Sequence, residues 1–201
     1  MLKNVQKRQS TFLRRKQIID ASRKLILKYG SEHVTVKRIA KEIGISDGAI
    51  YKHFKSKRQI LYFLVDYIED NLIGDIKKSY PFNNASEILK NILINHLSSI
   101  EQRRGISFLI IAEIISLGDK RLNKKIFDVL SKYISHIKDI LLKGVKAGEI
   151  RQDINLDMAA SIFFSMIQGL VTIWALGNYN FILEQKCISL WNFFREAIRS
   201  R

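Results

Sequence analysis

Apolar residues recur every three to four positions along most of the chain. Near the start, Phe12, Ile18 and Leu25 fall on one helical spacing, and Gly30 follows as a natural C-terminal cap. No run of alternating apolar and polar residues is long enough to indicate a β-sheet. Proline occurs once, at Pro81, and the glycines lie mostly between helical segments. The pattern predicts an all-α protein of about nine helices.

The boundaries of these helices follow from capping residues and from the single proline. Ser56 followed by Gln59 forms a capping box that opens the fourth helix, and Pro81 disfavours helix at Tyr80 and so ends it near Ser79. The loop at 80–83 is the expected hinge. The predicted helices span residues 11–28, 36–43, 47–54, 56–79, 84–101, 105–117, 121–146, 156–176 and 181–199.

The segment 35–54, TVKRIAKEIGISDGAIYKHF, has the features of a helix-turn-helix. Ala40 provides the small residue that two closely crossing helices need, and Gly44 tolerates the positive φ of the turn. Ile50 and Phe54 lie four residues apart and bury one face of the third helix. The other face carries small and polar residues, so it can approach the floor of a DNA major groove.

The distribution of charge along the chain supports binding to a nucleic acid. Residues 1–58 contain 16 Lys and Arg against 4 Asp and Glu, whereas residues 59–201 contain 18 against 15. A basic field confined to one end attracts a polyanion such as DNA, RNA or an anionic membrane. The cations at positions 3, 7, 8 and 14–16 form either a DNA-contacting arm or a solubilising tail. We therefore predict a DNA-binding domain at 1–58 and a second domain at 59–201.

The pattern T-V-x-x-I-A-x-E-I-G-I-S-x-G-A-I-Y-x-H-F-x-S-K-x-x-I-L, from Thr35 to Leu61, resembles the DNA-binding domain of the TetR/AcrR family of repressors. The remainder of the chain is similar to that family only in outline. The resemblance implies a three-helix N-terminal helix-turn-helix domain, followed by a helical domain that binds a ligand and forms a homodimer.

The resemblance also implies which residues contact DNA. The expected set combines two helix caps, the exposed face of the third helix and the start of the fourth: Thr35, Ser46, Asp47, Gly48, Ala49, Tyr51, Lys52, His53 and Lys57. Asp47 departs from an all-basic surface, because its carboxylate repels phosphate but can accept a hydrogen bond from a cytosine amino group. The alternative for the set is structural, with caps that only cap, a Tyr51 side chain that packs partly into the core, and polar groups that only contact solvent.

The C-terminal half contains the expected ligand site. Candidate wall residues are aromatic or polar side chains on otherwise apolar helix faces: His96, Phe108, Glu113, Phe163, Phe164 and Gln168. The alternative is that His96 and Glu113 are satisfied polar groups and that the phenylalanines are plain core. We expect a small lipophilic or aromatic effector that releases a palindromic operator, and a homodimer formed through the last two helices.

Other function classes find less support in the sequence. The histidines and Cys187 show no metal-ligand or nucleophile spacing, so we predict no enzyme, no catalytic or metal site and no cofactor. A membrane-surface binder lacks a strong aromatic helix face. A non-specific DNA-coating or nucleoid-associated protein remains the alternative. The N-terminus carries no signal-like apolar run and the cysteine stands alone, which predicts a cytoplasmic protein.

Overall fold

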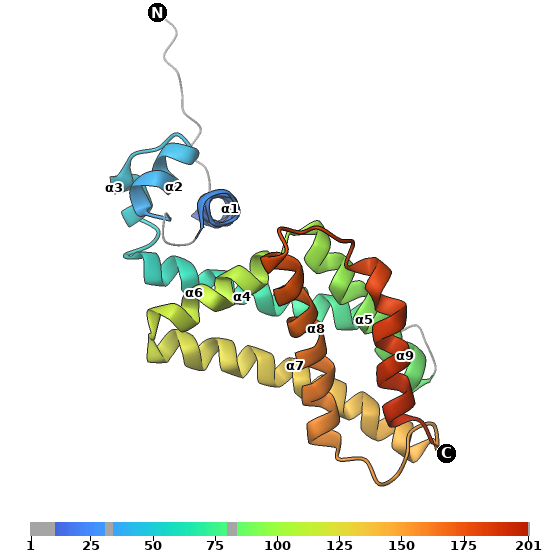
Figure 1. Ribbon diagram of the computed structural model, residues 1–201. Helices are drawn as coiled ribbons and strands as arrows, with labels where there is room; N and C mark the ends of the chain where they lie inside the picture. The colour runs from blue at the N-terminus through green and yellow to red at the C-terminus, as the bar shows by residue number, and fades with distance from the viewer. Residues whose placement is uncertain (1–10, 31–33, 80–83, 201) are drawn as a thin grey trace, which may run out of the picture. The chain divides into compact units, whose positions relative to one another are not determined.

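The computed structural model describes residues 11–30, 34–79 and 84–200 (Figure 1). Within these ranges the regular structure is helical, which confirms the predicted fold class. An isolated antiparallel bridge joins Ile150 to Arg199 near the end of the chain. The α-helices are α1 Thr11–Tyr29, α2 Val36–Glu42, α3 Asp47–Tyr51, α4 Lys57–Lys77, α5 Ala85–Gln102, α6 Ile106–Leu117, α7 Lys120–Lys146, α8 Leu156–Leu176 and α9 Cys187–Ile198.

The chain forms two compact units, Met1–Leu64 and Val65–Arg201. They divide within α4, six residues beyond the boundary that the sequence suggested. The reason is that the first two turns of α4 contribute Ile60, Leu61 and Leu64 to the buried interior. The division therefore follows the core and not the end of the helix-turn-helix motif. The expected hinge at 80–83 lies outside the described residues.

In the N-terminal unit, α1 packs on α2 and α2 packs on α3. The core contains Ile18, Ile39, Ile50 and Phe54, each with no exposed surface. Ala40 is also buried, as expected of the small residue where two helices cross. The turn after α2 places Gly44 at a φ of +68°, in the left-handed region that its lack of a side chain permits.

The structure corrects the predicted end of the third helix and the predicted extent of the N-terminal arm. The third helix was expected to reach Phe54, but α3 ends at Tyr51, and the chain then turns with the Phe54 amide donating to the Ile50 carbonyl at 2.9 Å. The turn allows Phe54 to be buried shortly before α4 begins. The first helix begins at Thr11 as predicted, so Arg14, Arg15 and Lys16 of the suggested arm belong to α1, whereas residues 1–10 lie outside the described ranges.

In the C-terminal unit, α7 packs on α8 and α5 packs on both α7 and α9. Figure 1 shows α8 and α9 running antiparallel, joined at one end by residues 177–186. Leu89 of α5, Ile137 of α7 and Ile167 of α8 are fully buried. Two ion pairs also link α4 to α7: Lys125 with Asp66, and Lys132 with Glu69 at 2.6 Å.

The ninth helix begins later than the sequence predicted. The expected start was Phe181, but α9 begins at Cys187 after a short 3-10 turn, η2, at Glu184–Lys186. Tertiary hydrogen bonds hold the preceding segment in an irregular form. The indole of Trp174 donates to the Phe181 carbonyl at 2.7 Å, and the Glu101 carboxylate accepts from the Leu183 amide at 3.2 Å.

One described helix, α8, is long and apolar enough to cross a membrane by length and composition. The core helix of a soluble protein satisfies the same two criteria, so this finding alone does not decide between the two environments. Only 33% of its most apolar window is buried within the protomer. Several apolar side chains of α8 therefore lie exposed, including Ile162, Ile173 and Leu176.

Candidate DNA-binding surface and ligand cavity

Side-chain caps fix the two helices of the helix-turn-helix. Thr35 precedes α2 and its Oγ1 accepts from the Arg38 amide at 3.2 Å, while Ser46 precedes α3 and its Oγ accepts from the Ala49 amide at 3.2 Å. Each cap satisfies a helix-end amide that would otherwise lack a partner. The predicted capping roles of these two residues are confirmed.

Most of the predicted contact residues of α3 lie at the surface. Asp47, Gly48 and Lys52 are exposed and Ala49 is partly exposed, whereas Ile50 between them is completely buried. Tyr51 is 54% exposed, so packing into the core does not account for it. The short helix thus presents a continuous polar face, as a helix that enters a major groove requires.

His53 lies just beyond α3 in a half-buried, cationic environment. Its Nδ1 is buried and has no hydrogen-bond partner. Burial lowers the pKa of His53 below its usual value, and the nearby Arg15, Arg14 and Lys52 lower this pKa further. The imidazole is therefore neutral at pH 7.

The start of α4 has the predicted capping box in a modified form. The Gln59 amide donates to Ser56 Oγ at 3.3 Å, as expected. The Gln59 side chain accepts from the amide of Lys55 at 2.7 Å, one residue earlier than in the standard box. Lys57 is the first residue of the helix and places an ammonium group beside a helix N-terminus, a combination suited to phosphate.

The C-terminal unit contains an internal cavity of about 30 Å³. Its walls come from α4, α5, α6, α7 and α8 and from the turn between α5 and α6. Half of the wall residues are aliphatic or phenylalanine, with Leu72, Ile100 and Ile111 among them. Four of the six residues that the sequence suggested lie on this wall: His96, Phe108, Phe164 and Gln168.

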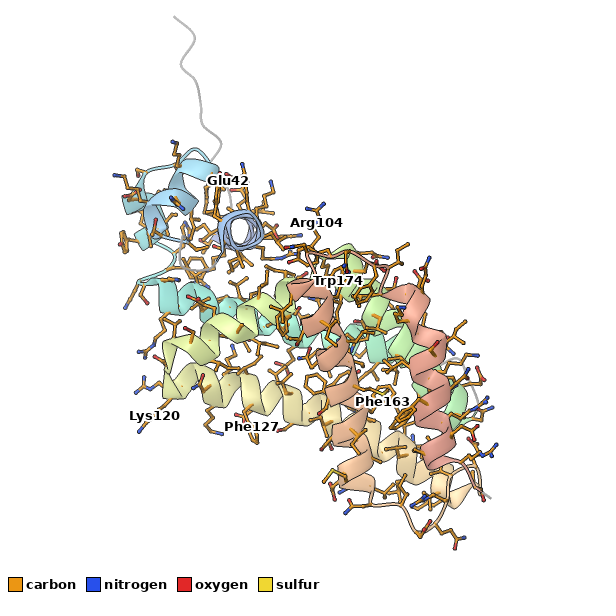
Figure 2. All side chains as sticks on the ribbon, in the orientation of Figure 1. Glu42, Arg104, Lys120, Phe127, Phe163 and Trp174 are labelled. Atoms are coloured by element: carbon orange, nitrogen blue, oxygen red, sulfur yellow. The ribbon has the colours of Figure 1, made fainter. Side chains whose placement is uncertain are left out.

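The other two suggested residues lie outside this cavity. Phe163 is completely buried and packs edge to face on Phe194 of α9, with ring centroids 5.2 Å apart. Figure 2 shows Phe163 between α8 and α9. Glu113 is half-buried on α6 and is not among the wall residues. Helical spacing predicted an apolar face for both but could not predict which core that face enters.

His96, on the cavity wall, is paired with Tyr133, a second buried polar ring that is not among the wall residues. His96 Nδ1 lies 2.9 Å from the hydroxyl of Tyr133, and both side chains are buried. Burial lowers the pKa of His96 to about 4, with a smaller contribution from Arg103, and burial raises the pKa of Tyr133. Both groups are neutral at pH 7.

Sequence reasoning missed the polar residues that α4 contributes to the cavity. The carboxyl group of Asp75 is buried and accepts from Ser99 Oγ at 2.8 Å. Burial raises the pKa of Asp75, although Ser99, Arg103 and Lys78 act in the opposite direction. Asn71, one turn earlier, has a buried amide nitrogen without a partner. Both lie close in sequence to the buried Ile68 and Leu72, a mixture that could have identified them.

Comparison with known proteins agrees with both parts of this arrangement. The family model for bacterial regulatory proteins of the tetR family matches residues 18–62, and the model described as the C-terminal region of YsiA-like protein matches residues 50–195. The chain belongs to the TetR family of bacterial regulatory proteins. It is a DNA-binding transcriptional regulator with a ligand-binding C-terminal domain, and regulators of this family act as dimers.

The chain is similar to three proteins whose names describe two different roles. A fatty acid metabolism regulator protein of Bacillus subtilis is 30% identical, over 83% of this chain and 86% of its own length. The structure of FadR from Bacillus subtilis in complex with stearoyl-CoA is 27% identical, with a TM-score of 0.78 over 92% of this chain and 99% of that one. The nucleoid occlusion factor SlmA of Shewanella pealeana is 23% identical, over 92% of this chain and 94% of its own.

Proposed function

We propose that this TetR-family regulator is a repressor that leaves a palindromic operator when a long-chain acyl thioester binds its C-terminal unit. The observation that carries the proposal is the cavity, whose wall combines aliphatic and phenylalanine side chains with polar groups on α4, α5, α6 and α8 and in the turn between α5 and α6. An acyl chain needs the first kind of surface and a thioester group needs the second. The similarity to a fatty acid metabolism regulator and to a stearoyl-CoA complex supports the same class of ligand.

The size of the cavity suggests how binding opposes repression. A volume of about 30 Å³ holds only a small molecule such as water, whereas drug-sized ligands occupy several hundred cubic ångströms. A long acyl chain therefore binds only a form in which the walls have moved apart. A ligand with such a strong preference for one form shifts the population toward it. Because α4 lines the cavity and also continues into the N-terminal unit, it is the element that transmits this change.

The proposed DNA contacts follow the exposed face of the N-terminal unit. Residues at the start of α3, Asp47, Gly48 and Ala49, would lie nearest the base edges. The remaining contacts would be to phosphates, sugars and the groove edge, and come from Thr35, Ser46, Tyr51, Lys52, His53 and Lys57. The exposure of the α3 face and the cationic surroundings of His53 support these roles.

The exposed apolar groove between α8 and α9 supports a homodimer through these two helices. The groove measures about 380 Å³ and its walls include Met158, Ile162, Leu190 and Phe193. Phe193 is 79% exposed, which is costly for a large aromatic side chain in water. A second copy would cover this face by two-fold symmetry and place two helix-turn-helix units on two half-sites. In a cytoplasmic regulator, this contact also accounts for the apolar surface of α8.

The test begins by selecting bound duplexes from a random DNA library at physiological salt. Enrichment of an inverted repeat would supply the operator. Titration of the complex with stearoyl-CoA, stearate and coenzyme A then tests the effector. The proposal expects stearoyl-CoA to release the operator and coenzyme A to leave it bound. Release by none of the three would contradict the effector class.

A non-specific nucleoid-associated protein is the second candidate. The similarity to nucleoid occlusion factors and the excess of cations in residues 1–58 favour it. Such a protein would retain most duplexes with similar affinity and a steep dependence on salt. A regulator would show a specific affinity at least about a thousandfold above the non-specific one. The same selection experiment therefore separates the two functions.

A further inference from the structure

Asn71 presents a buried hydrogen-bond donor that the protein itself does not use. Its side-chain nitrogen has no partner in the structure, and the residue lines the ligand cavity from α4. Buried polar groups are nearly always paired, because an unpaired donor loses its hydrogen bonds to water and gains nothing in return. A donor left unpaired on a cavity wall indicates an acceptor that arrives with the ligand.

His96 contributes a second donor to the same cavity. The Tyr133 hydroxyl is completely buried and keeps its proton, and among the described residues its hydrogen-bond partner is Nδ1 of His96. The O–H group needs an acceptor, so Nδ1 accepts and the ring carries its own hydrogen on Nε2. The neutral imidazole is thereby held in the tautomer whose free nitrogen is a donor.

These two donors suit one kind of ligand atom. Both are neutral, and the buried carboxyl group of Asp75 near them already accepts from Ser99. The wall also includes Arg103, Ser107 and Gln168, and its remaining side chains are apolar. An uncharged acceptor at the end of an apolar chain fits this combination, and the carbonyl oxygen of an acyl thioester is such an acceptor.

We propose that Asn71 and His96 donate hydrogen bonds to the carbonyl oxygen of the bound acyl thioester, with Asn71 as the residue that recognises the thioester group. This inference rests on the proposed effector class. Asn71 belongs to α4, the helix whose first turns form part of the N-terminal unit. The carbonyl contact therefore acts directly on the helix that continues into the DNA-binding unit.

The test compares stearoyl-CoA with its S-octadecyl thioether analogue, which has the same chain and coenzyme but no carbonyl oxygen. One or two neutral hydrogen bonds should make the wild-type protein bind the thioester roughly three- to tenfold more tightly. Asn71→Leu removes the donor while keeping a similar volume. It should reduce this ratio of affinities to about two or less, mainly by weakening the binding of the thioester.

Asn123→Leu is the matched control. Asn123 is also half-buried with an unpaired side-chain atom, its Oδ1, but it lies on α7 and not on the cavity wall. This variant should keep the wild-type ratio. Operator binding without ligand verifies that each variant is folded, and Asn71→Ala replaces Asn71→Leu if the larger side chain prevents folding.

The possible failures are distinguishable. Equal wild-type affinity for the two ligands would overturn the carbonyl contact and leave the effector class intact. An unchanged ratio in a folded Asn71 variant would overturn the role of Asn71. Absence of binding by both ligands to the wild-type protein would refute the effector class, and the carbonyl contact with it.

Discussion

At the scale of single residues, function depends on polar groups whose surroundings alter their chemistry. His53 and His96 have pKa values lowered mainly by burial, yet one lies in the helix-turn-helix unit and the other on an internal cavity. Thr35 and Ser46 act as helix caps and are also among the proposed DNA contacts. A cap and a phosphate contact are compatible, because a hydroxyl oxygen accepts while its hydrogen donates.

The first prediction concerns Lys57 at the start of α4. Lys57→Ala should weaken binding to all duplexes by a similar factor and reduce the slope of log affinity against log salt by about one, because one phosphate contact is lost. Fluorescence anisotropy at several salt concentrations measures both quantities. Lys146→Ala, which removes an exposed cation of the C-terminal unit, should change neither. A loss confined to one DNA sequence would contradict a phosphate contact.

The second prediction concerns pH. The pKa of His53 in the free protein lies below 6.5. A phosphate beside the ring would favour the imidazolium and raise this pKa in the complex. Binding then takes up a proton, so operator affinity should rise as pH falls through the bound pKa and level off below the free pKa. Titrations between about pH 8 and pH 5 measure the slope. His53→Gln should flatten the dependence of operator affinity on pH. An unchanged slope would show that another group takes up the proton.

At the scale of elements, local sequence determined most helices and tertiary contacts adjusted their ends. Asn84 caps α5 through the Glu87 amide at 2.7 Å, at the start that the sequence predicted for this helix. The predicted start of α9 was wrong, because Glu101, which is distant in sequence, and Trp174, which precedes the predicted helix, bind the backbone just before α9. No periodicity within residues 181–199 contains that information.

The third prediction uses two glycines that lie in different backbone conformations. Gly44→Ala should destabilise the protein by roughly 1–2 kcal/mol, because the turn holds φ at +68° even though the space around it is open. Gly74→Ala, within α4 and also in open space, should instead stabilise by up to about 1 kcal/mol. Urea unfolding measures both changes. A stabilising Gly44→Ala would show that the turn relaxes to a negative φ.

At the scale of the whole molecule, the two functions depend on two different cores. The N-terminal unit completes its core with the first turns of α4, and the C-terminal unit surrounds a ligand cavity with five helices. The α8–α9 face remains apolar and exposed in the single chain. The proposed recognition of a palindromic operator requires two copies, so the stability of the dimer should limit DNA binding.

The fourth prediction tests that face with two matched phenylalanines. Phe193→Asp places a charge in the α8–α9 groove and should convert the dimer into monomers with weaker operator binding. Phe127→Asp is the control: Phe127 is 68% exposed but lies on α7, where Figure 2 shows it pointing away from the helix. Sedimentation velocity measures the association state. A dimer that survives Phe193→Asp, or that Phe127→Asp dissociates, would contradict the proposed interface.

The sequence by itself determined the helical fold and the DNA-binding motif. The residues of the helix-turn-helix lie within 27 consecutive positions, and their caps, turn and buried face depend on contacts between near neighbours. Only the tertiary structure decided the ligand cavity. Its walls combine Asn71 and Asp75 of α4 with His96 of α5 and Gln168 of α8. Which apolar face meets which core is fixed by the packing of helices far apart in sequence, and helical periodicity describes each helix alone.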